Sequence, residues 1–358
     1  MLDNLEFIKV YYSGRLVGTL ALGPDRRCVF EYDLEWLQNG FSLSPFYLPL
    51  QSGLATARAT PFNGLFGVFY DSLPDGWGRL LVDRWLKTKG IDPAGISVLD
   101  RLALVGGHGM GALTYLPDHS PDDVVHEHSL DFYAAKVEKV LQNEDSDALD
   151  VLLKTAGSSA GARPKVMVSM DGKEWLVKFG ALYDPPDIGQ IEYEHSLLAA
   201  RCGIEMPKTR LFHGKYFGTR RFDRDGNKRF HVHSAAGLLY ASHQLPSLDY
   251  TGLMKATMAL CRNMEETEKM FRLMVFNILI GNKDDHARNF SFIYNGSNWK
   301  LAPAYDLLPS HGFGGQHTTT VNGHGNPTMQ NCLEVAKEAG FPDKRATKVI
   351  EQVQEGLK

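Results

Sequence analysis

A polar segment near residue 285 carries side chains that could transfer a phosphoryl group. The segment GNKDDHARN begins at Gly281, and Asp284 is followed five residues later by Asn289. Phosphoryl transfer uses one Asp that positions and deprotonates the attacking hydroxyl, while an Asn and a second Asp hold the metal ion. Protein kinases place the catalytic Asp and the metal-binding Asn at this same spacing. The spacing therefore makes Asp284 a candidate base and Asn289 a candidate metal ligand.

The second metal-binding carboxylate is predicted at Asp306. An Asn-Gly pair at 295–296 favours a hairpin between the strands FSFIY and WKLA. Folding this hairpin back brings Asn289 close to Asp306. Amide and carboxylate oxygens suit Mg²⁺ bound to nucleotide phosphates better than they suit zinc. Because Asp and Asn are also common turn and capping residues, the other parts of a kinase site must agree.

Segments upstream supply the parts that a kinase-like small lobe requires. Such a lobe needs a glycine-rich loop, a strand lysine and a helix glutamate that holds the lysine. The run GSSAGA at 157–162, Lys178 in the strand WLVKF, and Glu192 or Glu194 on the next helix follow in this order. Taken alone, the glycine-rich run could be a linker, Lys178 an exposed edge lysine, and Glu192 a surface residue of a helix. The prediction therefore depends on their appearing together in this order.

Three parts of the chain are expected to position these residues in an α+β fold. Residues 1–150 alternate apolar and polar positions early and predict a β-rich N-terminal subdomain. Residues 151–245 predict an α/β small lobe in which an Asp-Gly turn at 171–172 joins two strands. Residues 246–358 predict a helical large lobe, whose most apolar helix stops at Gly281.

Composition excludes several other classes of protein. The 38 Lys and Arg against 42 Asp and Glu give 38 − 42 = −4, so the overall charge does not favour a binder of nucleic acid. Four cysteines stand far apart without CxxC pairs, which argues against a zinc finger or a disulfide framework. The N-terminus lacks an apolar leader segment and no apolar stretch is long enough to span a bilayer, so we expect a cytoplasmic protein without a membrane segment.

Two further motifs have less specific interpretations. His231 and His233 alternate along an expected strand and could bind a metal, but no third ligand follows at a suitable spacing, which favours surface or substrate-groove histidines. The glycine-rich run at 105–111 precedes a strand rather than a helix, so a tight bend is expected there rather than a phosphate site. Hydrolase chemistry has no GxSxG motif to support it.

The motifs together resemble one family, the HipA-like serine/threonine kinase toxins of bacterial type II toxin-antitoxin systems. GNKDDHARNFSFI is similar to the catalytic loop of that family, and LAPAYDLLPS is similar to its metal-binding Asp segment. SSAGARPKV resembles the glycine-rich motif, and RRFDR resembles the hinge. GRLVGTL, FEYDLEWL and YDSLPDGWGR resemble the first subdomain. The resemblance implies a HipA-like protein-kinase-related fold over nearly the whole chain.

The resemblance also implies roles for single residues. Asp284 would be the catalytic base, braced by His286, and Asn289 and Asp306 would hold Mg²⁺. Lys178 would bind phosphate, and Ser158 would be autophosphorylated, with Ser159 as the near alternative. The residues implied in ATP binding are Ser159, Gly161, Ala162, Lys178, Glu192, Arg221, Phe222 and Tyr305.

A family member would be an ATP- and Mg²⁺-dependent kinase that arrests growth, as in persistence. Its partners would be a helix-turn-helix antitoxin and a protein substrate, possibly of the translation machinery, and it would meet DNA only indirectly through the antitoxin. Two alternatives stay open from the residues alone. The same phosphate and metal groups could serve a small-molecule kinase, and the chain could also be a catalytically silent regulator that only binds an antitoxin.

Overall fold

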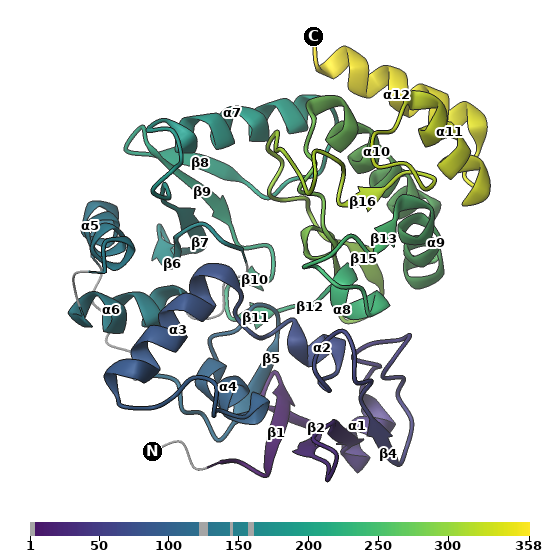
Figure 1. Cartoon of the computed structure of the whole chain (residues 1–358). Helices are drawn as coiled ribbons and strands as arrows, with labels where there is room; N and C mark the ends of the chain where they lie inside the picture. The colour runs from purple at the N-terminus through teal and green to yellow at the C-terminus, as the bar shows by residue number, and fades with distance from the viewer. Residues whose placement is uncertain (1–3, 122–127, 144–145, 157–160) are drawn as a thin grey trace. The chain divides into compact units, whose positions relative to one another are not determined.

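The computed structural model describes residues 4–121, 128–143, 146–156 and 161–358. The chain divides into two compact units, one formed by Met1–Gln190 with Arg210–Arg229, and one formed by Ile191–Thr209 with Phe230–Lys358. Both units mix helices and strands, which confirms the α+β class expected from the sequence (Figure 1). The three-part division at residues 150 and 245 stays a prediction.

The first unit begins with a five-stranded sheet in the order β4-β3-β2-β1-β5. Its first three strands form the expected meander, because each pairs antiparallel with the next. Ser13 and Gly14, both at positive φ, make the first turn. The strands are β1 (Phe7–Tyr12), β2 (Arg15–Leu22), β3 (Cys28–Tyr32), β4 (Leu54–Thr56) and β5 (Leu113–Leu116).

Six helices lie within the described part of the first unit. The third, fifth and sixth of them form a core with the second sheet of this unit, through buried residues that include Trp77, Leu81 and Val137. Figure 1 shows α5 and α6 beside the strands of that sheet. The helices are α1 (Leu34–Asn39), α2 (Gly67–Tyr70), α3 (Gly76–Thr88), α4 (Val98–Val105), α5 (Leu130–Leu141) and α6 (Ser146–Ala156).

The second sheet of the first unit has the order β6-β7-β9-β8. The expected Asp-Gly turn joins β6 to β7, because Met170 pairs with Lys173 and the register continues to Lys165 opposite Lys178. The strands are β6 (Lys165–Met170), β7 (Lys173–Lys178), β8 (Thr209–Phe212) and β9 (Tyr216–Arg220), and a small hairpin follows from β10 (Arg224–Asp225) and β11 (Lys228–Arg229).

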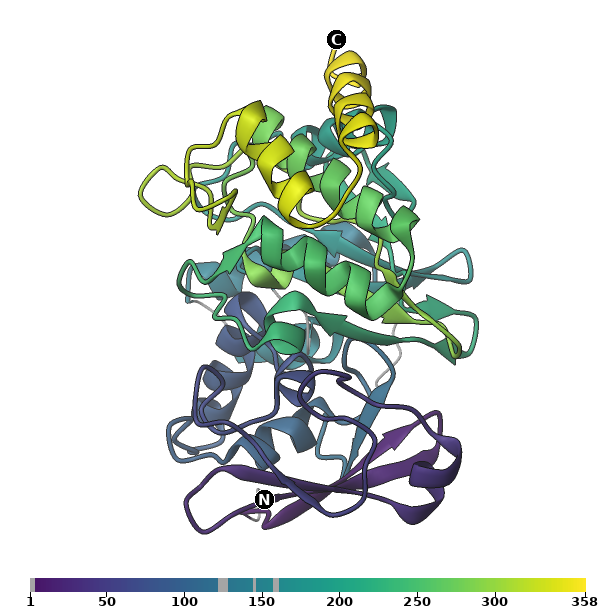
Figure 2. The ribbon, with the colours of Figure 1, turned by 90° about the vertical axis from the view of Figure 1, so that its right-hand side faces the viewer.

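The helix α7 (Ile188–Arg201) carries the chain into the second unit, which is mainly helical. Figure 2 shows the green and yellow helices of this unit lying against one another. The further elements of the unit are β12 (His231–Ser234), α8 (Ala235–Leu239), β13 (Leu248–Asp249), α9 (Tyr250–Cys261), α10 (Met264–Ile280), η1 (Ala287–Asn289), β14 (Ser291–Tyr294), β15 (Trp299–Leu301), β16 (Thr319–Thr320), α11 (Met329–Glu338) and α12 (Asp343–Gly356).

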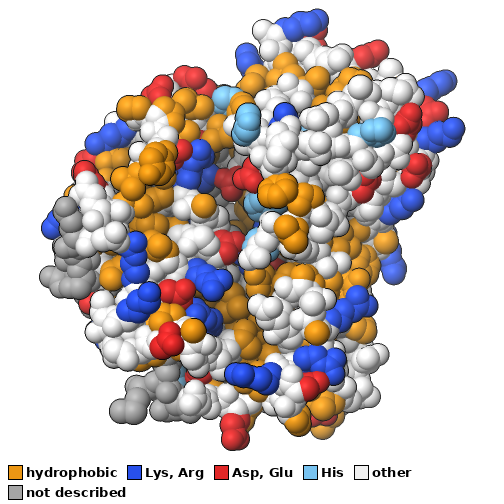
Figure 3. All heavy atoms as spheres, viewed as in Figure 1, with side chains coloured by type: hydrophobic (Ala, Val, Ile, Leu, Met, Phe, Trp, Pro, Cys, Tyr) orange, Lys and Arg blue, Asp and Glu red, His pale blue; other side chains and the backbone are white. Residues whose placement is uncertain are grey.

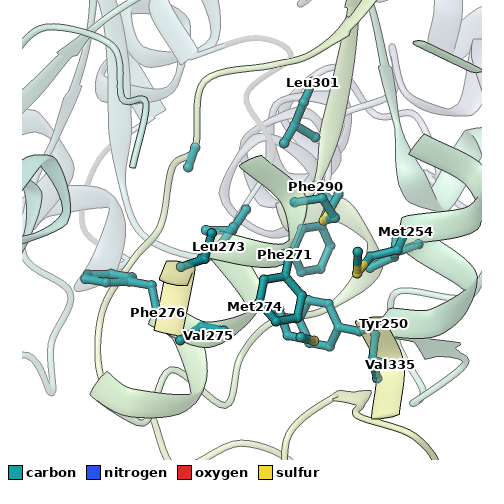
Figure 4. Close-up of a cluster of buried hydrophobic side chains, with 14 of the residues drawn as sticks. Tyr250, Met254, Phe271, Leu273, Met274, Val275, Phe276, Phe290, Leu301 and Val335 are labelled. Carbon is teal, nitrogen blue, oxygen red and sulfur yellow. The ribbon is translucent and has the colours of Figure 1, made fainter. Parts of the chain in front are cut away.

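The core of the second unit surrounds α10. Met270, Phe271 and Met274 of this helix are fully buried and pack with Tyr250 of α9 and Phe290 before β14 (Figure 4). At the outer face of the unit, α12 buries Val349 and Val353 in the same core. Lys, Arg, Asp and Glu side chains lie close to one another on the surface of this C-terminal region (Figure 3). The helix is therefore amphipathic.

Among the described residues, no helix combines the length and the apolar composition needed to cross a bilayer.

Candidate active site

The polar loop with Asp284 lies between a buried helix and a buried strand. At the end of α10, Gly281 adopts φ +70°, and its N–H donates to the carbonyl groups of the last helical turn. After the loop, β14 pairs antiparallel with β15, with Tyr294 opposite Trp299, as the Asn-Gly signal predicts. Because both ends are anchored in the core of the second unit, the loop has a defined backbone path.

Hydrogen bonds from both sides hold the backbone of Asp284. Its N–H donates to the Ser310 hydroxyl at 2.7 Å, and its carbonyl accepts from Asn289 Nδ2 at 2.7 Å. The Asp284 side chain is 65% exposed. A carboxylate in this position can meet a hydroxyl group of another molecule, while its own backbone stays fixed.

The orientation of the Asn289 amide fits the metal-binding role expected for it. Because Nδ2 donates to the Asp284 carbonyl, the oxygen Oδ1 points to the other side of the planar amide. An amide oxygen held in this way is a hard ligand of the kind that Mg²⁺ prefers. The donor set therefore fits a magnesium ion.

Asp306 adopts a backbone conformation that is uncommon for a residue with a side chain. Its φ is +54°, in the left-handed region that Asp tolerates better than most residues. Its carbonyl accepts from Asn282 Nδ2 at 3.2 Å, and the Asn282 side chain also meets Ser310 and Asn277. Asn282 and Ser310 thus connect the backbones of Asp284 and Asp306. The approach of the Asn289 and Asp306 side chains stays a prediction.

His286 lies beside Asp284 in a defined tautomer. Its Nδ1 accepts from the Arg288 N–H at 3.2 Å, so Nε2 carries the ring proton when the ring is neutral. The distance from Nε2 to Asp284 Oδ1 is 4.0 Å. The His243 ring lies near the His286 ring, with ring centroids 6.4 Å apart. The arrangement agrees with a bracing role for His286.

The hydroxyl of Tyr305 belongs to the same region of the second unit. It donates to the Arg288 carbonyl at 2.8 Å and lies 2.5 Å from Ser291 Oγ. These bonds join the segment before Asp306 to the end of the catalytic loop. The contact between Tyr305 and a nucleotide stays a prediction.

Asp285, next to the candidate base, is fully buried and was not singled out from the sequence. Its carboxylate accepts from the Tyr250 hydroxyl at 3.0 Å, from His317 Nδ1 at 2.9 Å, and from the N–H groups of Thr318 and Thr319. Asn277 Nδ2 donates to the same Tyr250 hydroxyl. Asp285 therefore ties the catalytic loop to α9 and to the segment that ends in β16.

The candidate phosphate-binding residues of the first unit lie at one end of the β6–β7 hairpin. Lys178 is 9% exposed, and its Nζ lies 5.7 Å from the centre of the Phe217 ring. Gly161 adopts φ +97° and, with Ala162, leads into β6. Ser158 and Ser159, the candidate phosphorylation sites, lie outside the described residues.

The candidate hinge contains a buried ionic cluster. Asp223 is fully buried and accepts from Arg221 Nη2 at 2.7 Å and from Arg224 Nη1 at 2.6 Å. Burial alone would raise the pKa of Asp223, but the Arg221 and Arg224 guanidinium groups lower it below its usual value. The Arg221 N–H donates to the Glu174 carbonyl, so this N–H is already engaged and does not donate to adenine. The partly buried Phe222 follows directly.

The glycine-rich run at 105–111 makes the tight bend that the sequence predicts. Its carbonyl groups face the same cluster of arginines, with the Gly111 carbonyl accepting from Arg224 Nη1 and the Gly107 carbonyl from Arg229 Nη1, both at 2.7 Å. The Gly111 N–H donates to Asp223 at 2.7 Å. The run thus joins the N-terminal sheet to the hinge segment within the first unit.

The structure brings together one half of the predicted site within each unit. Asp284, His286, Asn289, Tyr305 and Asp306 share a hydrogen-bonded region of the second unit, whereas Gly161, Ala162, Lys178, Arg221 and Phe222 belong to the first. Glu192, a buried residue of α7, falls in the second unit, so its pairing with Lys178 stays a prediction.

The expectation that His231 and His233 lie on the surface or in a groove was wrong. They are 1% and 0% exposed. β12 pairs along β14, and the His231 ring packs on the Trp299 ring of β15 with centroids 5.4 Å apart. The two rings therefore belong to the interior of the second unit.

Two family models match this chain. The HipA N-terminal domain matches residues 8–116, and the HipA-like C-terminal domain matches residues 157–358. The second match alone covers more than half of the sequence, so the chain belongs to the HipA-like family.

Similar proteins agree with this family assignment. The Sinorhizobium fredii protein named "Putative kinase Y4mE" is 30% identical, over 85% of this chain and 77% of its own. The Shewanella oneidensis protein named "Serine/threonine-protein kinase toxin HipA" is 26% identical, over 77% of this chain and 69% of its own.

One solved structure has the same fold over nearly the whole chain. It is the complex of Shewanella oneidensis HipA and HipB with operator DNA, which covers 98% of this chain and 88% of the matched chain. The TM-score is 0.72 at 18% identity. The match confirms the HipA-like fold expected from the sequence motifs, and the family and the names of its members support a kinase of the toxin class.

Proposed function

We propose that this protein is an ATP- and Mg²⁺-dependent serine/threonine protein kinase. The observation that carries the proposal is the pair of adjacent aspartates, one exposed and one buried. Asp284 is 65% exposed on a backbone that Ser310 and Asn289 hold on both sides, whereas Asp285 is fully buried. Only Asp284 can reach the hydroxyl group of a substrate.

Asp284 accepts the proton of the attacking hydroxyl as that oxygen bonds to the γ-phosphorus of ATP. The bond between this phosphorus and the β–γ bridging oxygen breaks, and ADP leaves with that electron pair. Asn289 and Asp306 would hold Mg²⁺, which neutralises phosphate charge when it is bound. His286 Nε2 lies 4.0 Å from Asp284 Oδ1, and the ring would brace this carboxylate in its position beside the substrate.

The nucleotide would be bound mainly by residues of the first unit. Lys178, Gly161 and Ala162 would contact phosphates, and the hinge segment with Phe222 would contact adenine. Within this proposal the glycine-rich segment is also regulatory, because a phosphate on Ser158 would add about −1.5 to −2 charges and oppose the phosphates of ATP. Ser159 is the alternative site.

We further propose that the kinase arrests growth by modifying a protein of the translation machinery, and that a helix-turn-helix antitoxin controls it. The support is family membership and the solved complex of a similar fold, whose title contains HipB and operator DNA. This protein would then contact DNA only indirectly, through the antitoxin. The net charge of −4 agrees with this indirect role.

The test uses purified full-length protein with γ-labelled ATP and Mg²⁺. We expect the wild-type protein to transfer label to protein, including this chain itself. Neither the wild-type protein with an excess of chelator nor the Asp284→Ala variant should transfer label. Label that enters only a metabolite in a cell extract would instead favour a small-molecule kinase. If no label enters protein or extract, although the wild-type protein is folded and binds an antitoxin, the result would favour a silent regulator.

The phosphorylation site is tested by mass spectrometry after incubation with ATP. We expect phosphate on Ser158 in preference to Ser159, and weaker ATP binding in the modified fraction. Equal ATP affinity of the two fractions would overturn the regulatory role of this phosphate without affecting the kinase assignment.

A further inference from the structure

Exposed apolar side chains of the second unit lie mainly beside the catalytic loop. In the part of this unit that the structure describes, three large apolar side chains are exposed, Leu197 by 48%, Leu245 by 60% and Phe313 by 67%. Leu197 lies on α7, away from the catalytic loop in the sequence, whereas the other two lie on loops that are close to it. Isolated exposed apolar residues are ordinary on a protein surface, so the argument depends on where these two lie and how they are held.

The loop with Phe313 is fixed to Lys283, the residue before the candidate base. Lys283 Nζ donates to the Gly315 carbonyl at 2.8 Å. The Lys283 carbonyl accepts from the N–H and the hydroxyl group of Thr318, at 3.1 and 2.9 Å. A Cβ atom built on Gly312 would lie 2.5 Å from Lys283 Cβ. The Phe313 side chain therefore follows directly on a backbone that touches the catalytic loop.

A tight turn presents the Phe313 side chain. The Gln316 N–H donates to the Phe313 carbonyl at 3.2 Å and closes a turn over Gly314 and Gly315. These two glycines have φ of +60° and +76°, which residues without a side chain adopt readily. Because the backbone of the turn is already ordered, covering the ring with a ligand costs little further backbone entropy.

A second short loop presents Leu245. The Ser242 hydroxyl accepts from the Leu245 N–H at 3.3 Å, and the Ser242 carbonyl accepts from the Ser247 hydroxyl at 2.7 Å. The same loop carries His243, whose ring centroid lies 6.4 Å from that of His286. The two loops thus lie beside the catalytic loop at residues that precede and follow the candidate base.

We infer that Leu245 and Phe313 are specificity-determining residues, which bind apolar side chains next to the acceptor hydroxyl of a protein substrate; this inference rests on the proposed kinase function. The Phe313 loop begins at Ser310, whose hydroxyl holds the Asp284 N–H at 2.7 Å. A substrate segment that brings its hydroxyl to Asp284 therefore brings its neighbouring residues to the loops. Apolar neighbours gain by leaving water there, whereas polar ones lose hydrogen bonds to water.

The test measures kcat/KM for synthetic peptides that carry one serine, with full-length protein, labelled ATP and Mg²⁺. Each pair of peptides differs only at one position near the serine, which is either leucine or glutamine. The ratio of kcat/KM between the two peptides is independent of general losses of activity, because such losses affect both peptides equally. We expect the wild-type protein to prefer leucine about tenfold or more at two positions, the effect of covering one apolar side chain.

Each substitution should remove one of these preferences. Phe313→Ser should reduce the preference for leucine to about twofold or less at one position, and Leu245→Ser should do so at the other. The double variant should lose both preferences. Leu197→Ser is the matched control, because it removes an exposed apolar side chain of α7, and it should keep both preferences.

Several results would overturn the inference. Wild-type protein that labels protein but no peptide, or that labels peptides without preferring leucine, would show that these loops do not recognise apolar neighbours of the acceptor. Unchanged ratios in Phe313→Ser and Leu245→Ser would exclude both side chains from substrate recognition. If these substitutions instead dissociated a wild-type dimer, the side chains would belong to a contact between two copies. Wild-type protein that labels neither protein nor peptide would overturn the proposed kinase function itself.

Discussion

Two neighbouring aspartates of the catalytic loop have opposite environments. Asp285 is fully buried among a tyrosine, a histidine and two backbone N–H groups, while the Asp284 side chain is 65% exposed. The Asp285 carboxylate therefore anchors the loop, whereas the Asp284 carboxylate lies at the surface.

The exposed Asp284 and the candidate metal ligand Asp306 should both be needed for turnover. Asp284→Ala should lower kcat about a hundred- to ten-thousandfold, which corresponds to about 3 to 5 kcal/mol of transition-state stabilisation. Asp306→Ala should cause a loss of similar order, because the phosphate charge would no longer be neutralised in place. Initial rates of phosphotransfer, with thermal unfolding to confirm folding, measure both effects. Wild-type rates in either folded variant would contradict the assignment.

The buried aspartate should instead be needed for stability. Asp285→Ala leaves several buried donors without an acceptor and should lower the free energy of unfolding by about 3 kcal/mol or more. Tyr250→Phe removes one donor of this carboxylate and should cost about 1 to 2 kcal/mol. Urea denaturation measures the losses. Asp284→Ala is the matched control and should change the free energy of unfolding by less than about 0.5 kcal/mol. An equal loss of stability in Asp284→Ala and Asp285→Ala would refute the different roles assigned to the two aspartates.

At the scale of elements, the end of α10 determines where the catalytic loop begins. The helix is buried along most of its length, and its N-terminus is capped by Asn263, whose side chain accepts from the Glu265 N–H. At the other end Gly281 leaves the helix at φ +70° with open space around its Cα. The direction of the loop therefore depends on the backbone conformation of one glycine rather than on a side-chain contact.

Substitution of this glycine should cost stability through the backbone alone. Gly281→Ala should lower the free energy of unfolding by about 1 kcal/mol, and Gly281→Asn should cost less, because Asn tolerates positive φ. Gly252→Ala is the matched control, since Gly252 lies in α9, without positive φ and without close neighbours. It should stabilise the protein by about 0.5 to 1 kcal/mol. Equal effects at both positions would show that backbone conformation does not distinguish them.

At the scale of the whole molecule, family membership and fold extend over both units. The HipA N-terminal model matches in the first unit, and the C-terminal model includes β6–β7 of the first unit and all of the second. Candidates for nucleotide binding come from both units, with Lys178 in the first and with Glu192 and Tyr305 in the second, whereas the catalytic candidates lie in the second unit. The proposed activity consequently requires the full chain, not one unit.

In cells, the proposed activity should be visible as growth arrest. Induction of the wild-type chain without an antitoxin should stop growth without lysis, because an essential protein is modified. Asp284→Ala should permit growth at equal protein abundance, and coexpression of a cognate helix-turn-helix partner should restore growth to the wild type. Growth curves with immunoblots measure this. Equal inhibition by Asp284→Ala would indicate that binding rather than phosphotransfer is toxic.

The sequence by itself determined the local elements of this protein and the order of its candidate site residues. Gly281 predicted the end of α10, and Asp-Gly and Asn-Gly turns predicted the two hairpins, because these signals act within a few residues. The register of the first hairpin, counted from its turn, could also have placed Lys165 opposite Lys178.

Only the tertiary structure decided which polar residues are buried and which distant segments meet. Nothing local distinguishes Asp284 from Asp285, and the burial of His231 and His233 depends on the neighbouring strands. The contact of Asp75 with Gly161 joins residues 86 positions apart. Burial and long-range contacts arise from the packing of whole elements, and composition and periodicity do not encode which element lies beside which.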